Sequence, residues 1–251
     1  RYKEEMLLKE AEASLQQEKL KMEFIANATH ELRTPLAIIK GNVDLATVHR
    51  DRDAKLSSVA LRAINNEVKH LSDILSSLVM LTSTKEQLEK STVDDQIDLK
   101  TLIDDVVKRC SVLAKKKNIS VTAKAIPKVV LVGNKIYLEK LFINLVANSI
   151  FYGNSRGRTL ITAEKSKRFI KINVADNGVG ISKEDLPHIF ERFYRVDKYR
   201  GSDENNTGLG LTIAKWVAEV HKGEVSVKSI KGKGSTFSVT LPIQGSKMLS
   251  S

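Results

Sequence analysis

The first third of the chain carries a hydrophobic repeat that advances in steps of three and four residues. It runs from residue 8 to residue 43, and this spacing is typical of a coiled coil that continues into a core-facing helix. A polar stretch at residues 49–53 then precedes a second helical run with one apolar face. The repeat consists of Leu8, Ala11, Leu15, Glu18, Met22, Ile25, Thr29, Leu32, Leu36, Ile39 and Val43, and the second face of Ala60, Ile64, Leu71, Ile74, Leu78 and Leu81.

These two runs predict a helical hairpin over residues 25–88, preceded by a signalling coiled-coil helix over residues 1–24. One hairpin cannot cover two apolar strips, so we predict a homodimer that forms a four-helix bundle. The alternative is a monomeric hairpin packed on the next domain. It fits less well because the repeat extends past any such domain.

The pattern of hydrophobic and polar residues changes after the hairpin. Residues 89–97 are polar and are predicted to be a linker, and residues 98–243 alternate short strand-like and helical segments. We therefore predict a two-layer α/β sandwich, followed by a tail at residues 244–251. Residues 182–207 are charged and aperiodic, which indicates a long functional loop. Expected strands are 119–125, 128–132, 160–163, 169–175, 224–229 and 235–241, and expected helices are 98–116, 134–152 and 208–221.

Composition narrows the class of protein. The 251 residues are 41% hydrophobic and 28% charged, enough for two globular domains, and no run of eighteen apolar residues occurs. The net charge of +11 is scattered among acidic residues without interleaved aromatics, so nucleic acid is not an expected partner. The single Cys110 is expected to be a small buried hydrophobe in a reducing compartment. Because the chain begins at Arg1, it reads as part of a longer protein.

One histidine lies in a segment whose residues could carry out a reaction. His30 follows Thr29, an inward position of the repeat, and is therefore expected to face outward. Glu31 adjoins it, and Pro35 removes a backbone donor, so we expect the helix to bend there. A neutral imidazole can attack phosphorus through one nitrogen while a carboxylate takes the proton from the other.

Two further clusters suit a bound nucleotide. Asn144, Asn148 and Tyr152 share a helix face, and amide oxygens without carboxylates suit a Mg²⁺ that takes most of its charge from substrate phosphates. Asp176 precedes a Gly-rich turn, where an acceptor can receive a hydrogen bond from an exocyclic amine. A second Gly-rich turn, residues 207–210, opens a helix whose N–H groups favour phosphate.

In their order and spacing these segments resemble the histidine kinase family, in which a dimerisation and histidine-phosphotransfer hairpin precedes a Bergerat-type ATPase domain. The resemblance covers nearly all of residues 20–243. The H box matches at residues 30–35, the N box at 144–152, the G1 box at 176–180, the F box at 189–195 and the G2 box at 208–210.

The resemblance implies autophosphorylation by ATP and transfer of the phosphoryl group to an aspartate of a response regulator receiver domain. It also implies cytoplasmic domains of a protein attached to the inner face of the plasma membrane. For the phosphotransfer hairpin, the resemblance implies that His30 is the phosphoacceptor, that Glu31 is its base and that Thr34 orients a hydrolytic water. For the ATPase domain, it implies that Asn148 and Asn144 hold Mg²⁺, that Asp176 binds the adenine amine in a pocket shaped by Gly178 and Gly180, and that Arg195 approaches the γ-phosphate. It also implies that Phe190 and Phe193 anchor the loop over ATP, and that ATP is contacted by Tyr152, Thr207, Gly208, Leu209 and Gly210.

The sequence departs from the family pattern at three places. Phe151 replaces a usual cation and Asn206 a common glycine, while Asn134 replaces an aspartate and should cap its helix equally well. Because Phe151 stands in place of this cation, we predict that the protein binds or turns over ATP less well than is usual in the family, and that Phe151→Lys raises the catalytic efficiency of autophosphorylation about 10-fold. The alternative is that the Phe151 ring simply packs in the core.

Other functions stay open at this point. A degenerate dimeric scaffold and a kinase that acts mainly as a phosphatase are the alternatives. A chaperone or topoisomerase ATPase would share the ATP-binding fold, but such a protein has no reason to carry the histidine-containing segment at residues 30–35.

Overall fold

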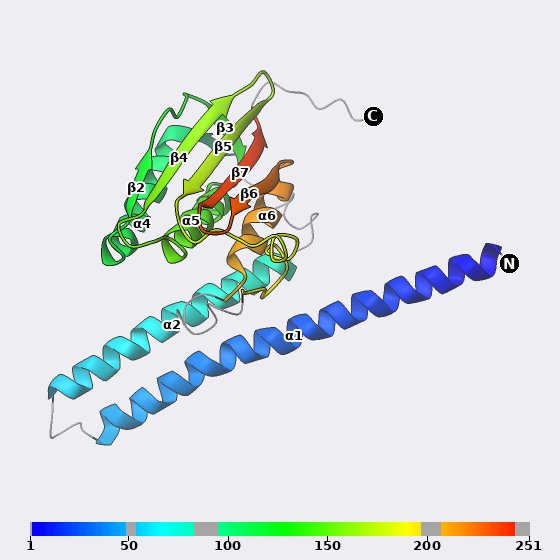
Figure 1. The fold of residues 1–251 in the computed structure, drawn as a ribbon. Coiled ribbons are helices and arrows are strands. Elements are labelled where there is room, and N and C mark those ends of the chain that lie inside the picture. The colour runs from blue at the N-terminus through cyan, green and yellow to red at the C-terminus, as the bar shows by residue number, and fades with distance from the viewer. Residues whose placement is uncertain (1, 49–53, 83–94, 197–206, 244–251) are drawn as a thin grey trace. The chain divides into compact units, whose positions relative to one another are not determined.

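The computed structural model describes residues 2–48, 54–82, 95–196 and 207–243, and the chain divides into two compact units between Met80 and Leu81. The first unit is helical and the second mixes helices with strands (Figure 1). The predicted helical hairpin and mixed α/β domain are therefore confirmed. In the described part of the chain, no helix combines the length and the apolar character that a membrane span needs.

The first unit contains α1 (Tyr2–Val48) and, except for its last two residues, α2 (Ala54–Thr82), and the two helices run in opposite directions (Figure 1). Helix α1 continues through Pro35 as a single helix, and the proline is buried. The bend expected at this residue stays a prediction. The missing N–H removes one hydrogen bond from a helix that is intact on both sides. Ala60 and Ile74 of the predicted α2 face are buried.

The predicted α1 repeat does not form a single buried face within this chain. Thr29, expected to point inward, is exposed, and its hydroxyl donates to the carbonyl of Ile25 at 2.8 Å. Ala28 is buried instead, one position earlier. Both helices carry uncovered apolar side chains: Leu15, Met22, Ile25, Leu36 and Val43 on α1, and Leu56, Val59, Leu61, Val68, Leu75 and Val79 on α2.

The second unit is built on a five-stranded sheet in the order β2-β4-β5-β7-β6. The β2–β4 pair is parallel and the other pairs are antiparallel. The strands are β2 (Ser120–Ala123), β4 (Arg158–Lys165), β5 (Phe169–Asp176), β6 (Glu224–Ile230) and β7 (Gly234–Pro242).

Strand β1 (Asp95–Asp98), which pairs with β3 (Val130–Gly133), was not predicted, because its residues fall largely in the range assigned to the linker. Four residues with one buried side chain, Ile97, give no periodic signal. Pairing with β3, which lies beyond the whole of the next helix in the chain, defines this strand.

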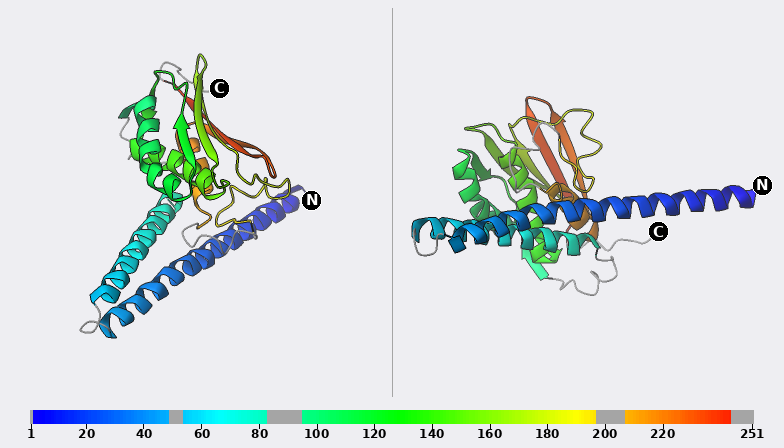
Figure 2. Two further views of the ribbon diagram at one scale, coloured as in Figure 1. Left: turned by 60° about the vertical axis from the view of Figure 1, so that its left-hand side comes forward. Right: turned by 90° about the horizontal axis from the view of Figure 1, so that it is seen from below.

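Three helices cover one face of the large sheet: α4 (Leu99–Lys116), α5 (Lys135–Phe151) and α6 (Gly210–Val220), as Figures 1 and 2 show. Alternate residues of β5 and β7 point into this layer and are buried, as expected for a half-covered sheet. The Asn134 side chain accepts a hydrogen bond from the backbone N–H of Tyr137 at 3.1 Å, so the predicted cap of α5 is confirmed.

Two residues without a motif have structural roles. His221 joins two helices: its Nε2 accepts from the backbone N–H of Asn134 at 3.1 Å and its Nδ1 lies 2.7 Å from the carbonyl oxygen of Val217. Burial lowers the pKa of His221, so the imidazole is held neutral. Cys110 is buried as predicted, and burial raises the pKa of its thiol to about 11.

Candidate functional site

A cavity of about 390 Å³ lies in the second unit, between the end of α5, the turn after β5, the loop at 182–196 and the start of β7. Its walls are mainly apolar and aromatic, and a few polar groups converge on it, which is typical of a small-molecule site. The lining residues are Asn148, Tyr152, Asp176, Val179, Gly180, Ile181, Ser182, Asp185, Ile189, Tyr194, Arg195, Val196, Leu211, Lys231, Ser235 and Phe237.

Asp176 supplies the carboxylate at the sheet end of the cavity. Its Oδ1 accepts from the backbone N–H of Gly178 at 2.8 Å and from that of Ser235 at 3.2 Å. Burial raises the pKa of Asp176, and these two hydrogen bonds partly oppose the rise. Since Oδ1 takes both backbone hydrogen bonds, Oδ2 is the acceptor available to a ligand.

The turn after Asp176 is packed so closely that its glycines are required. A side chain on Gly178 would collide with the carbonyl oxygen of Tyr152, and one on Gly180 with that of Ile230. Gly180 also has a φ of +64°, which L-residues rarely adopt. The turn is thereby fixed between the end of α5 and the β6–β7 turn, where the backbone N–H of Gly232 donates to the carbonyl of Val179 at 2.7 Å.

The start of α6 offers a site for negative charge. Leu209 is the N-cap, and no side-chain hydrogen bond caps this helix within the described residues. Gly208 has a φ of +70°, and its carbonyl accepts from the backbone N–H of Phe193 at 3.1 Å. The uncapped N–H groups and the helix dipole both favour an anion here.

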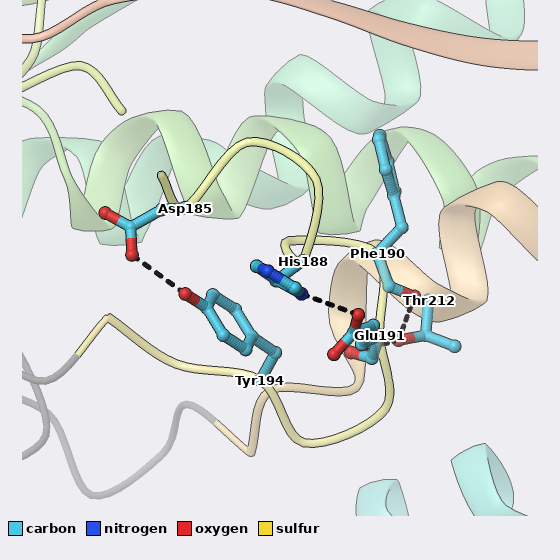
Figure 3. Close-up of polar contacts among 6 residues, drawn as sticks. All are labelled: Asp185, His188, Phe190, Glu191, Tyr194 and Thr212. Carbon is cyan, nitrogen blue, oxygen red and sulfur yellow. Dashed lines mark hydrogen bonds and ion pairs between the residues drawn. The ribbon is translucent and has the colours of Figure 1, made fainter. Parts of the chain in front are cut away.

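The loop at 182–196 is made of turns and is tied to α6. The hydroxyl of Thr212 lies 3.1 Å from the carbonyl oxygens of both Phe190 and Glu191, and donates to them (Figure 3). The Phe190 ring meets Phe237 edge-on, with ring centroids 6.5 Å apart. Phe190 therefore ties this loop to α6 and to β7 beside the cavity.

The two asparagines offer amide oxygens to a cation and, at Asn144, an N–H donor to an acceptor of the ligand. Asn148 lines the cavity, and Asn144 lies one turn earlier on α5, with its side chain facing Gly210. The Nδ2 atom of Asn144 is buried and has no hydrogen-bond partner among the described residues. In the described ranges no three His, Cys, Asp or Glu side chains cluster as metal ligands, so a metal here would depend on phosphate oxygens.

The structure thus brings five of the predicted residues to one cavity: Asn148, Tyr152, Asp176, Gly180 and Arg195. The remaining predicted residues of the second unit lie beside it. His30 and Thr34 are exposed on α1 of the first unit, and Glu31 next to His30 is half-buried. Asn206 lies outside the described residues.

Several lining residues were not predicted. Ser235 and Phe237 reach Asp176 only because β7 pairs with β5, with Thr236 opposite Ala175. No local pattern signals that pairing. The Ser182–Asp185 spacing, a Ser-x-x-Asp turn motif, could have drawn attention to Asp185.

Phe151 does not belong to the cavity lining. Its ring lies under the ammonium group of Lys117, at 5.0 Å from Nζ to the ring centroid. This cation–π contact joins the ends of α4 and α5. It favours the packing interpretation of Phe151 over the nucleotide-facing one.

Comparison with known families assigns both units. Residues 133–245 match the Histidine kinase-, DNA gyrase B-, and HSP90-like ATPase family, and residues 20–87 match the His Kinase A (phospho-acceptor) domain.

Curated relatives match most of the chain. Sensor histidine kinase RppB of Synechocystis is 34% identical over 224 residues, 88% of this chain and 49% of the relative. Phosphate regulon sensor protein PhoR of Pseudomonas aeruginosa is 30% identical over 232 residues, 92% of this chain and 52% of the relative. The chain therefore spans about half the length of these relatives.

Solved structures share the fold. Histidine kinase AdeS of Acinetobacter baumannii has a TM-score of 0.64 at 21% identity, over 86% of this chain and 98% of that one. Histidine kinase ThkA, in complex with response regulator protein TrrA, has a TM-score of 0.63 at 24% identity, over 90% of this chain and 63% of that one.

Proposed function

Because this chain belongs to the sensor histidine kinases, with a His Kinase A domain followed by an ATP-binding domain, we propose that it phosphorylates His30 with ATP. It then passes the phosphoryl group to an aspartate of a response regulator receiver domain. The observation that carries this proposal is the cavity around Asp176 in the same chain as an exposed His30 followed by Glu31.

ATP fits the cavity by its chemistry. Asp176 accepts a hydrogen bond from the exocyclic amine of adenine, while Tyr152 and the apolar walls cover the ring. The phosphates extend towards the N-terminus of α6, beside Gly208 and Gly210, where the helix N–H groups favour negative charge. Arg195 balances charge at the γ-phosphate. Asn148 and Asn144 hold Mg²⁺, which when bound neutralises charge on the phosphates.

His30 is the nucleophile. One ring nitrogen attacks the γ-phosphorus, the bond from that phosphorus to the bridging oxygen breaks, and ADP leaves. Glu31 takes the proton from the other ring nitrogen. Thr34, one helical turn further on, orients a water that hydrolyses the phospho-aspartate of the partner, which gives the protein a phosphatase activity as well.

We propose a homodimer for the helical unit. The exposed apolar side chains of α1 and α2 form stripes that one hairpin leaves in water, and a second copy covers them in a four-helix bundle. Residues 1–24 act as the signalling coiled coil, 25–88 as the bundle and 98–243 as the ATPase domain. A longer protein attaches these cytoplasmic domains to the inner face of the plasma membrane.

Incubation of the protein with Mg²⁺ and ATP labelled on its γ-phosphate tests the kinase proposal. A phosphohistidine is acid-labile and base-stable, so we expect label with this stability on the protein. A folded, ATP-binding protein that acquires no such label would instead be the dimeric scaffold. In a second incubation, with a phosphorylated receiver domain, release of phosphate that is faster than labelling of the protein indicates a kinase dominated by its phosphatase activity.

Phe151→Lys is now expected to give no gain in the efficiency of autophosphorylation. The ring lies beneath Lys117, so a second ammonium group removes a cation–π contact and places two like charges together. The loss of about 0.5–1 kcal/mol corresponds to a melting temperature lower by about 1–4 °C.

Initial rates across ATP concentrations, measured beside a melting curve, check this result. A rise of about 10-fold in the efficiency of a folded Phe151→Lys protein would restore the interpretation from sequence.

A further inference from the structure

One hydrogen bond inside the cavity involves two residues to which neither the proposed mechanism nor the motifs give a role. The hydroxyl of Tyr194 donates to Oδ1 of Asp185 at 2.8 Å (Figure 3). Both side chains line the cavity, and so does Arg195, the residue that follows Tyr194. The contact therefore lies one residue before the cation that is proposed to meet the γ-phosphate.

The carboxylate of Asp185 is itself fixed. Its Oδ2 accepts from the hydroxyl of Ser182 at 2.7 Å, and its backbone N–H donates to the same hydroxyl oxygen at 3.2 Å. These two hydrogen bonds restrict the conformation of the Asp185 side chain independently of its contact with Tyr194. Asp185 thus presents Oδ1 in a defined direction.

Tyr194 is supported from its other side as well. The ring of His188 lies against it, with centroids 5.5 Å apart, and Nδ1 of His188 is 2.7 Å from Oε1 of Glu191. The next residue back, Phe193, is tied by its backbone N–H to Gly208 at 3.1 Å. The chain leading into Arg195 is therefore held at successive residues, and the Tyr194 hydroxyl holds the residue immediately before Arg195.

The charge of Asp185 favours a hydrogen bond with Tyr194 over a contact with the phosphates of the nucleotide. Hydrogen bonds from Ser182 and Tyr194, together with the positive charge of Lys231, lower the pKa of Asp185, so it is ionised at neutral pH. Unlike an acceptor placed at the adenine amine, an ionised carboxylate near the phosphates of ATP is repelled by them. The same charge strengthens the hydrogen bond that it accepts from Tyr194.

We propose that Asp185 and Tyr194 are positioning residues for phosphoryl transfer: their hydrogen bond fixes the backbone before Arg195 and so directs its guanidinium to the γ-phosphate. The inference rests on the proposed kinase function. It predicts an effect on the transfer step and little effect on nucleotide affinity, because the hydroxyl of Tyr194 and the carboxylate of Asp185 are used by each other and act through the position of Arg195.

The test compares Tyr194→Phe in two backgrounds of the full chain, wild type and Arg195→Ala. In the wild-type background we expect the rate of autophosphorylation at saturating ATP to fall about 10-fold. The dissociation constant for ATP, measured by calorimetry, should stay within about 2-fold. In the Arg195→Ala background the same substitution should cost almost nothing, because Tyr194 acts through Arg195.

Two further variants sharpen the result. Asp185→Ala should reproduce the loss seen with Tyr194→Phe, and the double variant should lose no more than either single one. Tyr137→Phe is the matched control: it removes a tyrosine hydroxyl from α5, away from the cavity, and should leave the rate unchanged.

Three outcomes overturn the inference: a wild-type rate for Tyr194→Phe, an equal loss in both backgrounds, or a loss that follows a lowered melting temperature. These outcomes differ from failure of the proposed function, because in that case the unmodified protein acquires no acid-labile label at all.

Discussion

The His30→Gln protein is expected to bind ATP as the unmodified protein does and to acquire no acid-labile label from it. Glutamine has no ring nitrogen to attack phosphorus, so the nucleophile is lost. His30 is exposed on α1, whereas the ATP cavity is built entirely from residues of the second unit. The substitution therefore removes the acceptor without touching the donor, and the expected loss is complete.

Labelling and calorimetry on the same preparation measure both halves of this expectation. His70→Gln is the matched control, since His70 lies on α2 of the same unit and has no role in the proposed reaction. It should label normally. Label of unchanged stability on the His30→Gln protein would refute the assignment of the phosphoacceptor.

Asp176→Asn should weaken ATP binding by about 1–3 kcal/mol, which is roughly 5- to 150-fold in the dissociation constant. The amide oxygen of the introduced asparagine can still accept from the backbone N–H groups of Gly178 and Ser235, which in the unmodified protein donate to Oδ1 of Asp176. The amide nitrogen then replaces Oδ2 and points a donor at the amine of adenine. Two donors face each other, and the base loses its partner.

The same substitution should not unfold the domain. Burial raises the pKa of Asp176 in the folded protein, so its favourable contribution to folding is present at low pH and is lost as the pH rises through the folded pKa. At neutral pH the buried carboxylate is a cost, which the neutral amide removes. The melting temperature should be unchanged or slightly higher.

Calorimetry with ATP and a melting curve on each protein check these expectations, with the exposed Asp104→Asn as the control for loss of a carboxylate. Unchanged affinity for ATP in Asp176→Asn would contradict adenine recognition by this residue. Weak binding together with a much lower melting temperature would point to a structural role instead.

Local signals predicted most of the fold. Long helices and the strands with clear alternation, such as β5, are encoded by the spacing of apolar residues, because each element buries one face. Strand β1 was missed, since its backbone is ordered by β3 and not by its own four residues. Thr29, assigned to the inward side of the repeat, is exposed in the single chain, so its inward position stays a prediction for the dimer; a heptad pattern does not tell which of its positions meet α2 and which remain for another surface.

The candidate site was predictable where its residues lie within one motif. Asn148, Tyr152, Asp176 and Gly180 belong to short segments whose spacing is itself informative, and all four line the cavity. Arg195 was found from the resemblance. Phe151 was interpreted from its neighbours on the helix, but the contact that explains it comes from Lys117 at the end of α4.

The sequence by itself determined the helical and α/β units, the exposed His30 beside an acid, and the Gly-rich turns, because these depend on residues close together in the chain. Tertiary structure alone decided that Ser235 holds the carboxylate of Asp176 and that Asp185 holds Tyr194. Such contacts depend on strand pairing and on how loops pack. Side chains far apart in sequence, or in a loop without periodicity, meet only when the sheet and its helices have assembled.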